Sequence, residues 1–451
     1  MNQFRRILTT GILGIFCAVN LTAQVNDSNT PLHLIPPDYP HAYGKATVES
    51  VKADLDKILH YLERVTPAEV VDKTSGKKLD AGNPGNNAAF AKGDYRLFSY
   101  EWGVTYGGML AVANVSGDIR YKEYAQKRMD LLTSLAAYYR NKSEEVQKKS
   151  PVSSILHPHA LDDAGALCVA MIKAIDTSNI ERGLDYYLPV VENLIDFIMN
   201  KEYRLPDRTF ARNRPLRNTV WLDDMFMSVP ALAYMGIKVK GQLGYADEAA
   251  SQILKFRDKM FDEQKNIFIH GWLEDAAIQP KYHWARANGW AIMAIAEVLN
   301  VLPENHRDRK EIMELYHRHV QGLAALQSGS GFWHQLLDKS DTYLETSATA
   351  IFTYAIVNGI NKGWLDYEAF GPMALLAWEA VSTKIDSEGK VHGTCVGTGM
   401  GLDPAFYYYR PVSPYAAHSY GPVLLAGAEV MKLLNNHQYG INETAVQFIQ
   451  K

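Results

Sequence analysis

Cysteine is scarce in this chain, with three cysteines among 451 residues. Cys17 lies in an apolar N-terminal stretch that we expect to be removed, which leaves Cys168 and Cys395. Two cysteines do not make a disulfide framework in a protein of this size, so we expect both thiols to be free and buried. No closely spaced cysteine or histidine ligands predict a structural zinc site. We therefore expect neither a metal nor a cofactor.

The chain also lacks a strong charge of either sign and, after its N-terminus, long apolar runs. Its formal net charge is -4, which gives no basic surface for nucleic acid. No later apolar run reaches the length that a membrane span needs. These absences argue against nucleic acid and membrane as partners. They leave a soluble globular protein, which we expect to be a monomer or a weak oligomer.

The first 23 residues are typical of a signal peptide. Arg5 and Arg6 precede an apolar run from Ile7 to Val19, and Leu21-Thr22-Ala23 puts small residues before a cleavage site. Residues 24–45 form an extended, proline-rich lead-in, and we expect 46–451 to form a single domain. The sequence therefore predicts an exported protein, either periplasmic or extracellular.

Strand-like alternation is nearly absent, whereas helical periodicity runs from Ala46 almost to the end of the chain. The predicted class is therefore all-α. Twelve helical segments are expected, near residues 47–65, 100–115, 121–140, 160–177, 183–200, 221–235, 244–261, 284–301, 307–328, 343–361, 372–385 and 420–434.

These segments are of two alternating types. The second, fourth and every later even-numbered segment is rich in small and aromatic residues and opens on an unusual polar motif, such as Asp162-Asp163. The odd-numbered segments have ordinary amphipathic patterns with many charges. A helix that is apolar all round is buried, and one with a single apolar stripe lies outside. Six inner helices ringed by six outer ones make an (α/α)6 barrel.

Successive inner helices joined through antiparallel outer helices all point the same way, so their N-termini gather at one end. Every opening motif then faces one pocket. The N–H groups and partial positive charge of helix N-termini favour an anionic ligand there. Long stretches lead into inner helices, at 141–159, 202–220, 262–283 and 389–415, as is usual at a binding face.

Two aspartates are the leading candidates for catalysis. Asp163 and Asp223 occupy equivalent places on successive inner helices, so they could face each other across the pocket. A carboxylic acid can donate a proton near neutral pH when burial or a second carboxylate raises its pKa. The alternative is that these residues are helix N-caps, a position that aspartate favours. Capping would explain Asp162 and Asp224.

Several further side chains could bind a ligand at this end. Arg286 and Trp290 lie four residues apart on one helix face, and can offer a carboxylate partner and a sugar platform. Core packing and an internal salt bridge are the alternatives for them. Further candidates are Trp102, which opens the first inner helix, Arg212 in an arginine-rich stretch, His270 beside Trp272, Trp284 and His418. A solvated arginine stretch and a structural role for His418 remain alternatives.

Taken together, these motifs resemble those of the unsaturated glucuronyl and rhamnogalacturonyl hydrolases of glycoside hydrolase families 88 and 105. The resemblance runs in order from about Glu101 to Leu434. Its motifs are Trp221-Leu222-Asp223 with Met225-Phe226-Met227, His270-Gly271-Trp272, Trp284-Ala285-Arg286-Ala287-Asn288-Gly289-Trp290, Leu344-Glu345-Thr346-Ser347, Tyr409-Arg410-Pro411 and Tyr420-Gly421-Pro422 to Gly427. The family often has a histidine where this chain has Arg212.

The resemblance implies an (α/α)6 barrel and an exo-acting enzyme. Its substrate would be an acidic oligosaccharide left by a polysaccharide lyase, and the enzyme would remove a 4,5-unsaturated uronic acid from the non-reducing end by hydrating a vinyl ether. By motif position Asp223 would be the acid and base, and Asp163 would hold the sugar or stabilise positive charge. Trp284, Arg286 and Trp290 would line the unsaturated sugar's site, and His270 would contact the sugar.

Other classes of function stay open at this stage. An inverting (α/α)6 glycosidase would cut saturated glycans with two carboxylates. A helical-barrel epimerase would use histidines as acid and base, whereas the inner helices here open on aspartates. A non-catalytic glycan-binding protein would keep the aromatic residues and lose nothing when Asp223 becomes asparagine.

Overall fold

The computed structural model describes residues 28–31, 46–176, 183–442 and 445–449. The predicted signal peptide and most of the predicted lead-in lie outside these ranges. None of the helices in the described ranges combines the length and the apolar character needed to cross a bilayer.

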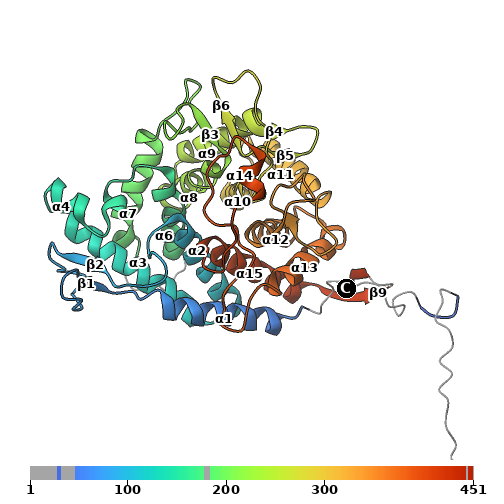
Figure 1. Ribbon diagram of the computed structural model, residues 1–451, viewed down its shortest axis with the longest axis horizontal. Coiled ribbons are helices and arrows are strands. Elements are labelled where there is room, and N and C mark those ends of the chain that lie inside the picture. The colour runs from blue at the N-terminus through green and yellow to red at the C-terminus, as the bar shows by residue number, and fades with distance from the viewer. Residues whose placement is uncertain (1–27, 32–45, 177–182, 443–444, 450–451) are drawn as a thin grey trace, which may run out of the picture.

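Six helices form a closed inner ring (Figure 1). Each packs against the next, and the last packs against both the fifth and the first, which closes the circle. In order they are α2 (Tyr100–Ser116), α6 (Gly165–Asp176), α8 (Val229–Tyr234), α10 (Ala285–Val301), α12 (Thr346–Asn361) and α15 (Tyr420–Asn436).

Six further helices surround this ring, each packed on the inner helix next to it in sequence or, for the first, on α15. They are α1 (Val48–Val65), α3 (Ile119–Arg140), α7 (Gly183–Asp196), α9 (Leu243–Met260), α11 (Arg309–Ala324) and α13 (Tyr367–Ser382). In α10 every residue from Ala285 to Leu299 is buried, whereas α1 buries one stripe that includes Leu55 and Leu62. The predicted (α/α)6 barrel and its division into inner and outer helices are confirmed.

Two inner helices begin later than predicted. The segments expected at 160–177 and 221–235 open with single 3-10 turns, η2 (Leu161–Asp163) and η4 (Leu222–Met225). Asp163 accepts a hydrogen bond from the backbone N–H of His159 at 3.1 Å, which competes with a regular helical turn. Pro230 stands in the first turn of α8, where its fixed φ and missing N–H are tolerated. The paired aspartates therefore precede their helices.

One outer helix begins earlier than predicted, at Tyr367 instead of residue 372. The Asp366 side chain caps it by accepting from the N–H of Ala369 at 2.8 Å. Pro372 lies inside its first turns and does not end it.

The described residues also form five short antiparallel strand pairs. Their two to five residues are too few for a clear alternation in the sequence. Four pairs lie in connections that lead into inner helices, and the fifth packs against α13. They are β1 (Val70–Asp72) with β2 (Ala88–Phe90), β3 (Thr219–Trp221) with β6 (Gly271–Leu273), β4 (Phe261–Asp262) with β5 (Ile267–Phe268), β7 (Trp333–His334) with β8 (Leu344–Glu345), and β9 (Gln438–Asn442) with β10 (Ala445–Ile449).

The two ends of the barrel therefore differ. Connections into inner helices are long and carry strands and the short helices α4 (Glu144–Lys149), α5 (Ser153–Leu156) and α14 (Pro404–Tyr408). Connections from inner to outer helices are short, as at 117–118 and 362–366. We call the end with the long connections the mouth and the other end the far end.

Candidate active site

Asp223 and His270 meet at the mouth. His270 Nε2 lies 3.0 Å from Asp223 Oδ2. Their proximity follows from the pairing of β3 with β6, in which Trp221 lies opposite Gly271 and the N–H of Leu222 donates to the carbonyl of His270 at 3.0 Å. A short ladder thus joins two motifs that are 47 residues apart.

A tyrosine holds the other side of the His270 ring. His270 Nδ1 lies 2.7 Å from the hydroxyl of Tyr407, which also accepts from the N–H of Gly401 at 2.9 Å. Gly271 allows the segment that carries Met400 and Tyr407 to come close to β6, because a Cβ on Gly271 would lie 2.0 Å from Met400 Sδ. Both ring nitrogens of His270 therefore have fixed partners, which sets the orientation of the ring toward Asp223.

A second close approach brings the Asp162-Asp163 turn beside η4. A Cβ on Gly165 would lie 1.9 Å from the carbonyl oxygen of Met227, so only glycine fits there. Asp163 Oδ2 binds His159 Nδ1 at 2.7 Å. The two predicted catalytic aspartates thus stand on neighbouring turns, each beside a histidine.

Arg212 links Asp224 of one aspartate pair to Asp162 of the other. Its guanidinium binds the Asp224 carboxylate with two hydrogen bonds, of 2.5 and 2.9 Å, and Asp162 at 3.2 Å. It also lies over the Trp221 ring, 4.1 Å from the centroid. The expectation that capping explains Asp162 and Asp224 is wrong, because neither side chain caps its turn and both bind Arg212 instead.

The carboxylates around Arg212 outnumber the positive charge. Burial, opposed by Arg212 and reinforced by Asp224 and Asp223, raises the pKa of Asp162 to about 7. Burial and the charge of Asp224 also raise the pKa of nearby Glu202 to about 7. Asp162 therefore carries a proton over much of the acidic range, although a third of its side chain is still accessible from the pocket.

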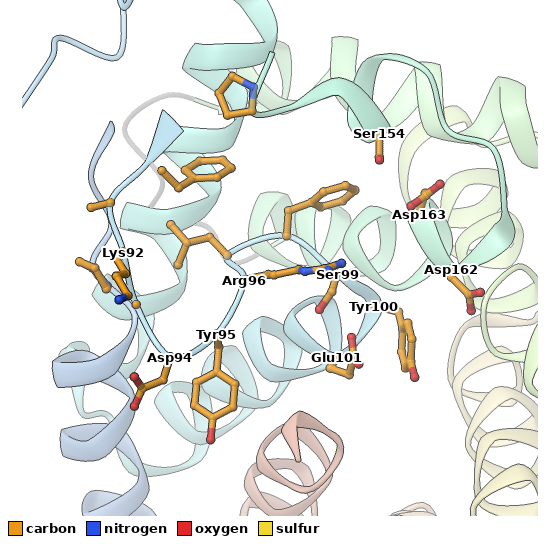
Figure 2. Close-up of a pocket in the computed structure, with 17 residues that line it drawn as sticks. Lys92, Asp94, Tyr95, Arg96, Ser99, Tyr100, Glu101, Ser154, Asp162 and Asp163 are labelled. Atoms are coloured by element: carbon orange, nitrogen blue, oxygen red, sulfur yellow. The ribbon is translucent and has the colours of Figure 1, made fainter. Parts of the chain in front are cut away.

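A cavity of about 640 Å³ opens beside this cluster. Asp162 and Asp163 form part of its wall, and the segment from Phe90 to Glu101 forms much of the rest. Figure 2 shows both aspartates near Tyr100 at one side of the cavity, with Lys92 and Asp94 at the other. The volume suits one or two sugar rings.

Trp284, just before α10, and Arg286 and Trp290 within α10 were predicted to line the site. Trp284 and Trp290 are each 1% exposed, and Trp290 stacks on Phe226 at 5.2 Å. Arg286 is also buried, and its guanidinium donates to the carbonyls of Cys395 at 2.6 Å and Val396 at 2.7 Å. In this structure these residues hold the walls in place, and the rings are not open platforms.

The two remaining candidates are also buried. His418 Nε2 lies 2.6 Å from the Tyr100 hydroxyl, and burial together with Arg286 lowers its pKa well below the usual range. The His418 ring is therefore neutral near pH 7. Trp102 stacks on Tyr95, a cavity residue, at 4.9 Å from behind.

Sequence reasoning missed Tyr100 and Tyr407, which contact the two candidate histidines. Tyr407 stands in a run of aromatic residues without helical periodicity, so no pattern singled it out. Glu345 was quoted only within a motif, yet it accepts from the N–H groups of Ser347, Ala348 and Cys395 and so joins the start of α12 to the 395–396 segment.

The two cysteines that we expected to be free, Cys168 and Cys395, are free and buried. Within the described ranges, histidine, cysteine, aspartate and glutamate side chains form no group of three or more that could hold a metal ion.

A model of Glycosyl Hydrolase Family 88 matches residues 61–434. Among relatives, an unsaturated 3S-rhamnoglycuronyl hydrolase of Formosa agariphila is 27% identical over 47% of this chain and 58% of its own length. An unsaturated rhamnogalacturonyl hydrolase, YesR of Bacillus subtilis, is 25% identical over 55% of this chain and 72% of its own. The match with the first of these thus spans little more than half of that relative.

Solved structures agree on the fold. A possible member of the GH105 family from Salmonella enterica has a TM-score of 0.68 at 23% identity, covering 90% of this chain and 98% of its own. An unsaturated glucuronyl hydrolase from Bacillus sp. GL1 has a TM-score of 0.55 at 15% identity, covering 84% and 96%.

Proposed function

The chain belongs to glycosyl hydrolase family 88, and from this premise we propose that it removes a 4,5-unsaturated uronic acid from the non-reducing end of lyase-generated oligosaccharides. The contact between Asp223 and His270 carries the proposal. The Asp223 carboxyl group is held by a fixed histidine at the mouth of the barrel, on the turn next to the one whose Asp162 and Asp163 line the sugar-sized cavity. One group positioned in this way can act first as acid and then as base.

In the proposed reaction Asp223 donates its proton to C4 of the sugar, and positive charge develops at C5 and the ring oxygen. Water then adds at C5 and returns a proton to the Asp223 carboxylate. The resulting hemiketal opens to a ketone, which turns the glycosidic carbon into a hemiacetal that releases the next sugar. Asp163 stabilises the developing positive charge or binds a sugar hydroxyl.

The surroundings of Asp223 support this assignment. Arg212 neutralises Asp224, and the raised pKa of Asp162 leaves that neighbour protonated in acid, so the carboxylates do not all repel one another. The names of two relatives, an unsaturated 3S-rhamnoglycuronyl hydrolase and an unsaturated rhamnogalacturonyl hydrolase, pair a uronate with rhamnose. Unsaturated uronyl-rhamnose disaccharides are therefore the first substrates to test.

The test is the ultraviolet absorbance of the conjugated carboxylate, followed with lyase-generated disaccharides. Wild-type protein should abolish the absorbance, and Asp223→Asn should slow this by about 10²- to 10⁴-fold, the usual contribution of a positioned acid or base. The matched control is Asp258→Asn on the exposed face of α9, which should leave the rate unchanged. Unchanged absorbance across a wide panel, with sugar released from saturated glycans, would instead support an inverting glycosidase.

A further inference from the structure

A second cavity lies on the barrel axis at the far end. Its volume is about 460 Å³, and residues of α2, α6, α8, α10, α12 and α15, or of the turns that follow them, all contribute to its wall. The C-terminal halves of the inner helices meet there. A hollow of about 260 Å³ shares Lys362, Glu429 and Lys432 with it, so the two spaces adjoin.

Glu297 fixes one side of this far-end cavity. Its side chain is only 2% exposed and accepts hydrogen bonds from Lys173 at 2.7 Å, Tyr234 at 2.8 Å and Tyr354 at 2.6 Å. Although burial opposes ionisation, Lys173 and the two hydroxyls lower the pKa of Glu297, which is therefore charged. A carboxylate that accepts hydrogen bonds from this many donors is held rigidly and has few acceptor positions left for a ligand.

Two asparagine side chains on the wall of the far-end cavity have amide oxygens that can still accept a hydrogen bond. Asn358 is 4% exposed, and its Oδ1 has no hydrogen-bond partner among the described residues. Asn300 Oδ1 likewise has none within that part of the chain. A buried acceptor left without a donor costs about 1–3 kcal/mol, so such groups normally face water or a ligand hydroxyl. Both residues line the same cavity.

The charge of the wall favours an anion. Lysines 173, 238, 362 and 432 line the cavity, against two glutamates, Glu297 and Glu429. Lys432 binds Glu429 at 2.6 Å, as Lys173 binds Glu297. Part of this excess complements the negative ends of the inner helices. The helix ends do not account for the Asn358 and Asn300 oxygens beside these lysines. Those oxygens are acceptors without a donor among the described residues, and the carbonyl groups at helix ends are acceptors too.

We propose that the far-end cavity binds an anionic monosaccharide, with its hydroxyls donating to Asn358 and Asn300 and its acidic group near Lys362. A volume of this size accommodates one sugar ring with a carboxylate or phosphate. The proposal concerns a site separate from the mouth and does not depend on the proposed reaction.

The test is isothermal titration of the purified full-length protein with D-galacturonate, D-glucuronate, glucose 6-phosphate and neutral D-galactose. Because the mouth could also bind uronates, each titration is repeated with His270→Gln, which alters the mouth, and with Lys362→Gln and Asn358→Leu, which alter the far end. Lys362 is exposed, so its replacement leaves the fold intact even where Asn358→Leu does not.

The expected result is saturable binding that persists in His270→Gln and weakens about tenfold or more in Lys362→Gln, the cost of one lost charged contact. The turnover of the protein's substrate should be the same in Lys362→Gln as in wild type. Tighter binding of the phosphate or of a uronate identifies the acidic group. No saturation by about 10 mM, loss of all binding in His270→Gln, no weakening in Lys362→Gln, or equal binding of galactose would each overturn the proposal.

Discussion

The mouth and the far end of this barrel use the same kinds of side chain in opposite proportions. At the mouth Asp162, Asp223 and Asp224 surround one arginine, Arg212, and are reached by long connections. At the far end four lysines surround two glutamates, and the connections there are short. The helices themselves are shared by both ends. One helical frame therefore carries a carboxylate-rich cluster at its mouth and a lysine-rich wall at its far end.

Removal of the central charge at each end should have the largest effect on stability. Arg212→Leu should lower the free energy of unfolding by about 3–5 kcal/mol, because Asp224 would be left buried without a partner. Glu297→Gln should cost about 2–3 kcal/mol, since Lys173 remains partly exposed. Urea unfolding measures both, and only Arg212→Leu should also reduce activity per folded molecule.

Arg217→Ala, on the exposed part of the same arginine-rich stretch, is the control for Arg212 and should be neutral. Adding Asp224→Asn to Arg212→Leu should restore about half of the lost stability, because the unpaired charge is then absent. A neutral Arg212→Leu would show that the carboxylates at the mouth need no counter-charge.

One glycine at each end tests how tightly that end is packed. Gly165→Ala should cost about 1–3 kcal/mol and reduce activity, because the new methyl group would meet the Met227 carbonyl and push the two aspartate turns apart. Gly107→Ala, at the far-end cavity, meets nothing within 4 Å and should add up to about 1 kcal/mol through helix propensity. Thermal unfolding and turnover measure the pair, and equal effects would contradict this account of the mouth.

A further effect appears only when the pH is changed. The pKa of Glu202 is raised to about 7 in the folded protein, so its proton stabilises the fold below its ordinary value of 4.5, and this contribution is lost as pH rises through 7. As the pH rises from 4.5 to 8, the free energy of unfolding of Glu202→Gln should therefore increase by about 1–3 kcal/mol relative to that of wild type, because one pKa unit corresponds to about 1.4 kcal/mol.

Urea unfolding at the two pH values measures this gain, with the exposed Glu314→Gln as the control. A difference between Glu202→Gln and wild type that is the same at both pH values would contradict the raised pKa.

Much of the frame could be predicted from the sequence, because apolar periodicity separates a helix buried all round, such as α10, from a striped one, such as α1. The candidate aspartates were also found, since two adjacent carboxylates before an apolar helix are unusual. The different contacts of these aspartates could not be predicted, because Arg212 reaches Asp224 and Asp162 from a long connection whose course no periodicity indicates.

The far-end cavity left no signal in the sequence for a related reason. Lys173, Glu297 and Asn358 each look ordinary in their own helix, and only ring closure brings them together. The burial of Trp290 was likewise undetermined, since a tryptophan four residues from an arginine fits both a sugar platform and a core.

The ladder between β3 and β6 has a consequence for grafting. Because it fixes Asp223 against His270 across 47 residues of intervening chain, the segment from Thr219 to Leu273 must be moved as one block if this chemistry is transplanted into another barrel. The stretch between β6 and α10 has to move with this block, because the N–H of His270 donates to the carbonyl of Tyr282 at 2.8 Å and the Gln279 side chain bonds both backbone groups of Leu273.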